Sequence, residues 1–292
     1  MLFRSLGDQI ICKAQSVEQE NQRRHDHHPT AQPQGSGQQA SPHPDSQTDQ
    51  KQFQHPLSHS LPMIFETGML AGPKPEGPTM CIVLFDWQPD SPTPLRVAAN
   101  RDEFHARPAQ AARWRGDIFC GLDLTAGGTW LGIHRNGRFA VVTNYREPIT
   151  DRQPGERSRG LLPTAFLESR QTPENFAHAL ASEQAHYGAF NLLVGTPDSL
   201  WYLGNRGAPP QPVAPGLHGL SNGLMDAPWP KVLRGKQRLA DAIASGGTLE
   251  QLLGVVNDRY QPDDTVLPDT GVGRELERLV APVFIQSPAY GT

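Results

Sequence analysis

The chain has 292 residues, of which 37% are hydrophobic and 19% charged, and its formal net charge at pH 7 is −4. This length allows one large domain or two small ones, and the acidic balance offers no basic face for nucleic acid. No apolar run approaches the roughly 18 residues of a membrane span. The three cysteines contain no Cys-x-x-Cys pair, which argues against a disulfide framework and a cysteine zinc site. We therefore expect a cytoplasmic protein with a small-molecule ligand, no metal and no cofactor; its oligomeric state is left open.

Residues 1–79 are interpreted as a disordered, low-complexity tail. Their central part is rich in Gln, His, Pro, Ser and Asp and poor in aliphatic residues, so it cannot bury enough apolar surface to offset its chain entropy. The segment His25-Asp26-His27-His28 could bind a metal ion loosely, but a solvated tail is the favoured interpretation because nothing there fixes ligand geometry. A folded pattern begins abruptly at Met80. Either a start codon assigned too far upstream or a cleaved prosegment would explain this change.

From Met80 onward the pattern indicates strands separated by turns, followed by helices. A hairpin is predicted where Asn136-Gly137 joins two apolar strands, with positive φ at both central residues. One helix is predicted to start with Thr172 as its N-cap and Pro173 at its first position. Sheets covered by layers of helices account for this order. The expected strands are residues 81–87, 95–99, 130–134, 138–143, 190–194, 200–203 and 281–285, and the expected helices are residues 159–169, 173–185, 229–245 and 248–257.

Cys81, directly after Met80, is the candidate nucleophile. A cysteine in an apolar strand usually packs as a small hydrophobe, and this remains the structural alternative. If Met80 and everything before it were removed, Cys81 would carry both a thiol and a free α-amine, which is a nucleophile with its own base. Arg101 is the candidate cation that would lower the thiol pKa, and Asp102 or Glu103 could hold the amine.

The charged cluster Arg101-Asp102-Glu103 ends the second predicted strand. On an extended strand, Arg101 and Glu103 share one face while Asp102 points to the other. Both Arg101 and Asp102 can therefore face Cys81 only if the strand ends or bulges there. The alternative is a surface charge cluster that contributes little to stability.

Seven groups of residues between Met80 and Lys231 together form a recognisable pattern. They are Met80-Cys-Ile82, Asn100-Arg-Asp-Glu103 with Arg107-Pro108, Gly127-Gly-Thr-Trp-Leu-Gly132, Thr143-Asn-Tyr145, Gly204-Asn-Arg206, Gly219-Leu-Ser-Asn222 and Trp229-Pro-Lys231. In this order they resemble the NRDE family, the family of transport and Golgi organization protein 2. The resemblance covers residues 80–292 and implies a fold of the N-terminal nucleophile hydrolase type, an α+β four-layer αββα sandwich with antiparallel sheets. It also implies a distant similarity to the cysteine amidases that cleave penicillin V and conjugated bile salts.

Carried over to this chain, the resemblance implies Cys81 as nucleophile, Arg101 and Asp102 beside it, and Asn144 and Asn222 as donors to the oxyanion. In the amidases the arginine and aspartate are not adjacent, so which acid orients the amine here is open. The family usually continues beyond Thr292, which suggests a truncated gene model. The expected function is hydrolysis of a non-peptide amide or thioester with an apolar acyl group. The alternative is a non-catalytic protein that binds or transports haem or an acyl lipid on the same scaffold.

Overall fold

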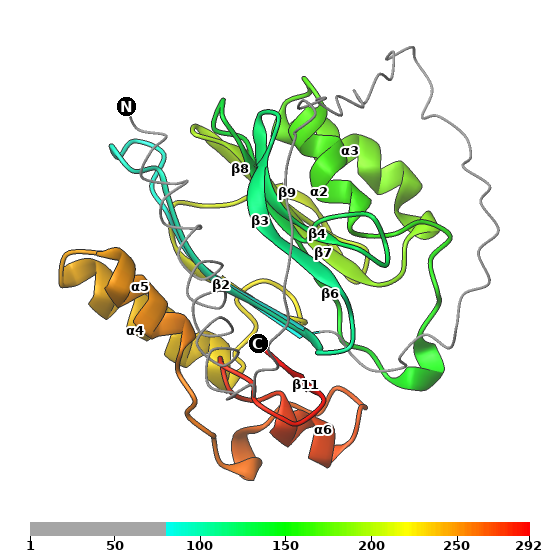
Figure 1. Ribbon diagram of the computed structural model, residues 1–292, viewed down its shortest axis with the longest axis vertical. Helices are drawn as coiled ribbons and strands as arrows, with labels where there is room; N and C mark the ends of the chain where they lie inside the picture. The colour runs from blue at the N-terminus through cyan, green and yellow to red at the C-terminus, as the bar shows by residue number, and fades with distance from the viewer. Residues whose placement is uncertain (1–79) are drawn as a thin grey trace, which may run out of the picture.

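The computed structural model describes residues 80–292, so the expected tail and its histidines lie outside the described residues. The strands of the described part form two antiparallel sheets, each with helices on its outer side (Figure 1). In the first sheet the order is β10-β1-β2-β11. Its strands are β1 (Met80–Trp87), β2 (Leu95–Phe104), β10 (Gly216–Leu220) and β11 (Tyr290–Gly291).

The second sheet follows the chain from one edge to the other, in the order β3-β4-β5-β6-β7-β8-β9. Its strands are β3 (Ala109–Arg115), β4 (Ile118–Asp123), β5 (Leu131–His134), β6 (Phe139–Asn144), β7 (Phe190–Thr196), β8 (Ser199–Gly204) and β9 (Ala208–Pro212). The helices are α2 (Leu161–Glu168), α3 (Pro173–Glu183), α4 (Pro230–Ala244), α5 (Leu249–Val256) and α6 (Arg274–Leu279), with 3-10 turns at Ile149–Asp151, Gln184–His186 and Asp264–Val266.

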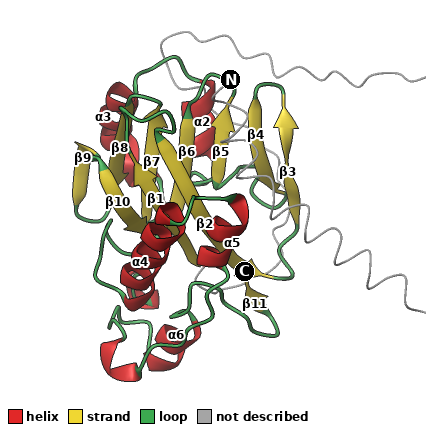
Figure 2. Ribbon diagram, turned by 90° about the vertical axis from the view of Figure 1, so that its left-hand side faces the viewer, coloured by secondary structure: helices red, strands yellow, loops and turns green. Residues whose placement is uncertain are grey.

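Three apolar cores separate four layers. Between the sheets, alternate residues of β1 face the second sheet, because side chains of a strand alternate between its two faces. Residues Ile82 and Leu84 face the other way and pack under α4 and α5, which cover the first sheet in Figure 2. The helices α2 and α3 cover the second sheet through Phe166 and Leu180. The core between the sheets includes Val83, Phe85, Trp87, Val141, Leu193 and Tyr202. The predicted α+β class and four-layer αββα order are confirmed.

Helix starts follow the local sequence. The Thr172 hydroxyl accepts a hydrogen bond from the Asn175 N–H at 3.1 Å, and Pro173 occupies the first position of α3, as predicted. The start of α5 has a capping box in which Thr248 and Gln251 satisfy each other's backbone N–H groups. These caps fix where the helices begin and therefore which side chains reach the sheets.

The hairpin β5–β6 forms where it was predicted, but its turn differs. Positive φ occurs only at Gly137, with φ 91°, and not at Asn136. The Gly137 N–H donates to the His134 carbonyl at 2.8 Å, and the Asn136 side-chain oxygen accepts from the Arg138 N–H at 3.2 Å. This is a longer loop in which a single left-handed glycine closes the turn.

The strand predicted over residues 281–285 is wrong. Its backbone is satisfied from elsewhere: the buried Asn100 side chain donates to the Val283 carbonyl at 3.0 Å, and the Phe284 N–H donates to the Asp258 carbonyl at 2.9 Å. The short β11 pairs with β2 instead. Among residues 80–292 we find no helix with the length and apolar character needed to cross a membrane.

Candidate active site around Cys81

The register of β1 and β2 places Cys81 directly opposite Arg101. Both residues therefore lie on the face of the first sheet that is turned toward the second sheet, together with Val83 and Ala99. Cys81 is buried, with 5% of its surface exposed. The sequence could not establish this pairing, because the two residues are on different strands and only the register brings them together.

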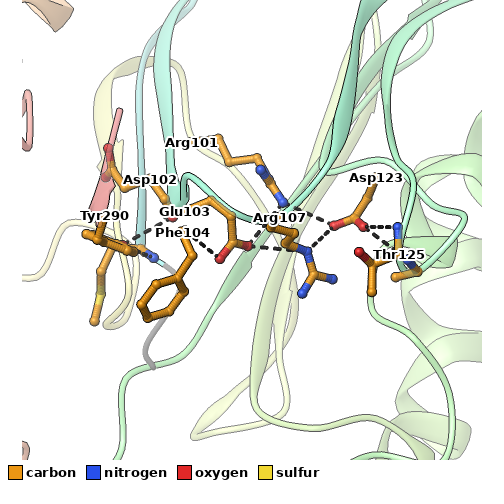
Figure 3. Close-up of polar contacts among 10 residues, drawn as sticks. Arg101, Asp102, Glu103, Phe104, Arg107, Asp123, Thr125 and Tyr290 are labelled. Atoms are coloured by element: carbon orange, nitrogen blue, oxygen red, sulfur yellow. Dashed lines mark hydrogen bonds and ion pairs between the residues drawn. The ribbon is translucent and has the colours of Figure 1, made fainter. Parts of the chain in front are cut away.

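Asp102 lies opposite Met80 and on the other face of β2 from Arg101. Strand β2 continues to Phe104, so neither a strand end nor a bulge turns both side chains toward Cys81. The Thr292 hydroxyl donates to the Asp102 carboxylate, and the Tyr290 hydroxyl donates to the Asp102 carbonyl at 3.1 Å. Figure 3 shows Asp102 beside Tyr290, away from the arginines.

Asn222 follows β10 and joins the two sheets. Its side-chain oxygen accepts the Cys81 N–H at 3.1 Å, and its amide nitrogen donates to the Asn144 carbonyl at 2.8 Å. Asn144 ends β6 in the second sheet. The Ser221 hydroxyl donates to the Cys81 carbonyl at 2.7 Å, so consecutive side chains hold both sides of the Cys81 backbone. Both asparagines named by the resemblance are therefore in contact around the candidate nucleophile.

The segment that carries Asn222 is held by a charged cluster of His218, Asp226 and Lys236. His218 contacts the Asp226 carboxylate through Nδ1 at 2.7 Å and the Ala214 carbonyl through Nε2 at 2.8 Å. Lys236 donates to the same carboxylate at 2.7 Å. Because both ring nitrogens of His218 face acceptors, the ring is held with both protonated. The hydrogen bond that His218 donates to the Asp226 carboxylate is the main cause that raises the pKa of His218, against a smaller opposing effect of burial.

Cys81 opens onto a cavity of about 210 Å³ between the sheets. Arg101 and Asn144 line it too, whereas Asp102 and Asn222 are not among its lining residues in the described part of the chain. Of the five site residues named from the sequence, three therefore share one cavity. Asn222 contacts the backbone of Cys81 and of Asn144, whereas Asp102 contacts Thr292 and Tyr290 on the other face of β2.

Four charged side chains form one network on the cavity wall (Figure 3). Arg101 Nη2 lies 3.1 Å from both Glu103 Oε2 and Asp123 Oδ2, and Arg107 Nε lies 2.7 Å from the same Asp123 oxygen. Burial alone would raise the pKa of Asp123, but hydrogen bonds from Arg107 and from the Ala126 N–H outweigh it and hold that pKa below its usual range. The charge of Arg101 is thus shared with two carboxylates as well as with the thiol.

The thiol is neutral in the chain as it stands. Burial, followed by the negative charge of Asp102, raises the pKa of Cys81 to about 12, and the opposing effect of Arg101 is smaller. The expectation that Arg101 lowers the thiol pKa is correct in direction, but desolvation dominates. A thiol with this pKa is almost entirely protonated at neutral pH.

A family model described as Transport and Golgi organisation 2 matches residues 80–292. The chain belongs to this family. Its relatives include the Transport and Golgi organization protein 2 homologs of Bos taurus, 37% identical over 242 residues, and of Homo sapiens, 35% identical over 238 residues; each comparison covers 73% of this chain and 86% of the relative. A solved structure, a Caenorhabditis elegans ortholog of N-acylethanolamine-hydrolyzing acid amidase, matches with a TM-score of 0.36 and 10% identity, over 71% of this chain and all of that chain.

A second cavity of about 330 Å³ lies next to the first in this Transport and Golgi organisation 2 family member. Its lining is largely aliphatic and comes from β2, from strands β3 to β5 and from α5. The two cavities have Arg101, Gln110, Gly121 and Trp130 in common, so they meet at Arg101. The site of this family member therefore combines a polar part at Cys81 with an adjoining apolar part.

Two cations near the site, Arg159 and Lys231, were not predicted as site residues from the sequence. Arg159, just before α2, lines the polar cavity. Lys231 in α4 is buried and donates to the Val280 carbonyl at 3.1 Å. Burial and then the charge of Arg146 lower the pKa of Lys231 to about 8, while Asp102 opposes this change. Lys231 belongs to a segment quoted for the family resemblance, but nothing in the sequence shows that α4 turns it inward.

Proposed function

We propose that this protein is a cysteine hydrolase of the N-terminal nucleophile type, which cleaves a non-peptide amide or thioester with an apolar acyl group. One observation carries the proposal: the Asn222 side-chain oxygen holds the Cys81 nitrogen while the Cys81 side chain opens onto a cavity that Arg101 and Asn144 also line. The aliphatic cavity beside it is suited to the acyl group.

Catalysis would require removal of Met80. In the intact chain the Cys81 nitrogen belongs to a peptide bond and cannot accept a proton, and the thiol pKa of about 12 leaves little thiolate. Cleavage between Met80 and Cys81 would turn this nitrogen into an amine with an ordinary pKa of about 7.7–8, which can serve as a general base. The Asn222 oxygen is already in place to orient it.

The proposed reaction has two steps. First, the Cys81 amine takes the thiol proton while Sγ attacks the acyl carbon; the resulting ammonium then protonates the leaving amine or thiol as its bond to carbon breaks. Second, the amine removes a proton from water, which attacks the thioester and releases the acid and the free thiol. Asn144 would donate to the oxyanion, and the charges of Arg101 and Asp102 would set the protonation of Cys81.

The second candidate function is binding or transport of an amphipathic ligand, an acyl lipid or haem, without catalysis. The observation that favours it is the combination of the apolar cavity with a protonated, buried Cys81 in the intact chain. In this case the cavities would be used and the amine chemistry would not. We propose the cytoplasm as the location of either function.

The experiment that tests the first function begins with the mature N-terminus. The protein is expressed from its own upstream region, and intact mass spectrometry with N-terminal sequencing identifies its first residue. A chain that begins at Cys81 should hydrolyse acyl amides or thioesters and form a covalent acyl adduct at Cys81. Cys81→Ala should abolish both, while Cys120→Ala, at the other described cysteine, which lines the apolar cavity, should still form the adduct at Cys81. A chain that keeps Met80 and shows no turnover would overturn the hydrolase and leave the binding function.

A further inference from the structure

The polar cavity carries one positive charge more than its own carboxylates balance. Three arginines line it, Arg101, Arg107 and Arg159, against two carboxylates, Glu103 and Asp123. The first two arginines are paired with the two carboxylates at distances of 2.7–3.5 Å. The charge of Arg159 is therefore the one that an incoming group can neutralise.

Arg159 has no carboxylate within ion-pair distance among residues 80–292. Within the described residues its guanidinium makes one hydrogen bond, from Nη1 to the Ala189 carbonyl at 2.8 Å, which leaves donors of the guanidinium fork for a ligand. The carboxylate of Glu147 also acts on its charge, but Glu147 is engaged by Arg206 at 2.8 Å. Burial lowers the pKa of Arg159, and the negative form of Cys81 opposes this, which is consistent with a half-buried cation facing the thiol.

The backbone holds Arg159 at this wall. The Thr129 N–H donates to the Gly160 carbonyl at 2.9 Å, so the turn after β4 is tied to the start of α2. The same turn packs so closely that a Cβ on Gly128 would lie 2.4 Å from the Gly160 carbonyl carbon. A cation fixed in this way loses little conformational entropy when it binds an anion.

We propose that Arg159 binds a compact oxyanion, a carboxylate or a phosphate, on the leaving-group side of the scissile bond. The substrate would then be an apolar acyl group joined to an anionic amine or thiol, with its acyl carbon at Cys81, its chain in the aliphatic cavity and its anion at Arg159. The two cavities meet at Arg101, which lies opposite Cys81, so the acyl and anionic parts would occupy adjoining cavities at the nucleophile. The position of the scissile bond at Cys81 rests on the proposed function. The binding of an anion at Arg159 rests only on the residues that line the cavity.

The test measures binding separately from turnover. Three ligands with the same acyl chain are titrated into the full chain carrying Cys81→Ala: N-octanoylglycine, N-octanoyl phosphoethanolamine and the neutral N-octanoylethanolamine. We expect at least one anion to bind about tenfold more tightly than the neutral ligand, because charge-assisted hydrogen bonds are the stronger ones. Adding Arg159→Gln should remove that preference and leave the affinity for the neutral ligand unchanged. Which anion binds more tightly identifies carboxylate or phosphate as the preferred group.

Two further variants separate binding from folding. Arg159→Lys keeps the charge and should retain part of the preference, and Arg170→Gln, at an exposed arginine outside both cavities, should leave it intact. Equal affinity for all three ligands, or an equal loss for all of them with Arg159→Gln, would overturn the anion site. Turnover of the neutral amide without any anion preference would leave the hydrolase standing and the anion site refuted. A preference for the anions without turnover in the chain that retains Cys81 would support the anion site and refute the hydrolase.

Discussion

The link that Asn222 makes between the two sheets can be tested by two substitutions. Its side chain satisfies the Cys81 N–H at 3.1 Å and the Asn144 carbonyl at 2.8 Å. Asn222→Ala removes both partners, and a buried polar group left without its partner costs about 1–3 kcal/mol. Because the contact with Asn144 is only partly buried, we expect a total loss of about 2–4 kcal/mol in the free energy of unfolding.

Asn222→Asp separates the two hydrogen bonds. One carboxylate oxygen can still accept the Cys81 N–H, but the other would face the Asn144 carbonyl where the amide nitrogen now donates. Only the protonated acid can donate there, and burial also favours the neutral form, so the folded-state pKa of this aspartate lies above the unfolded value of about 3.9. The native state then binds more protons, and the stability of the variant relative to wild type falls as pH rises from about 4 toward the folded-state pKa.

Urea unfolding of wild type and both variants, measured at several pH values, tests this reasoning. Subtracting the wild-type curve removes the titration of all other groups. If Asn222→Ala changed the free energy of unfolding by no more than about 0.5 kcal/mol, the range usual for surface substitutions, the two hydrogen bonds of Asn222 would not be stabilising contacts. A deficit of Asn222→Asp that shrinks with rising pH would refute the protonation argument.

Three further predictions concern other parts of the structure. Gly128→Ala should destabilise the protein by about 1–3 kcal/mol through overpacking, while the control Gly254→Ala, in open space on α5, should stabilise it slightly; thermal melting compares them. His218→Gln should lower the free energy of unfolding most below about pH 6.5, where the protonated ring contributes fully, and this loss should shrink as pH rises through the raised folded-state pKa. An equal loss of stability at all pH values would exclude a charged ring paired with Asp226. In the chain with Met80 attached, alkylation of Cys81 by iodoacetamide should accelerate about tenfold per pH unit between about pH 7 and 9, and a plateau there would contradict the pKa of about 12.

Apolar periodicity and capping residues were enough to predict most of the layers. Strands β1, β7 and β8 are apolar runs bounded by turn residues, and Thr172 with Pro173 marks the start of α3. Strand β3 was missed because its polar and small residues are mostly exposed and lack an apolar run. The segment 281–285 has a strand-like composition, but side-chain and loop contacts, not a neighbouring strand, satisfy its backbone.

The candidate site was predictable in its residue types but not in its geometry. Cys81 and Arg101 could be named from the sequence, whereas their pairing depends on a register that only the folded sheet defines. The alternation rule correctly separated Asp102 from Arg101, since β2 continues past both. Arg159 could not have been found, because its position at the cavity depends on the tight contact between two loops that are distant in sequence.

The Tyr290 hydroxyl sets the order in which the nucleophile can be assembled during synthesis. It accepts the Met80 N–H at 2.8 Å and donates to the Asp102 carbonyl, and the first contact joins residues 210 positions apart. Residue 290 must therefore have been synthesised before the Met80 N–H and the Asp102 carbonyl can make their final contacts. Closing so long a loop is slow. Any protease that recognises the folded surroundings of Cys81 can act only after translation has passed this point.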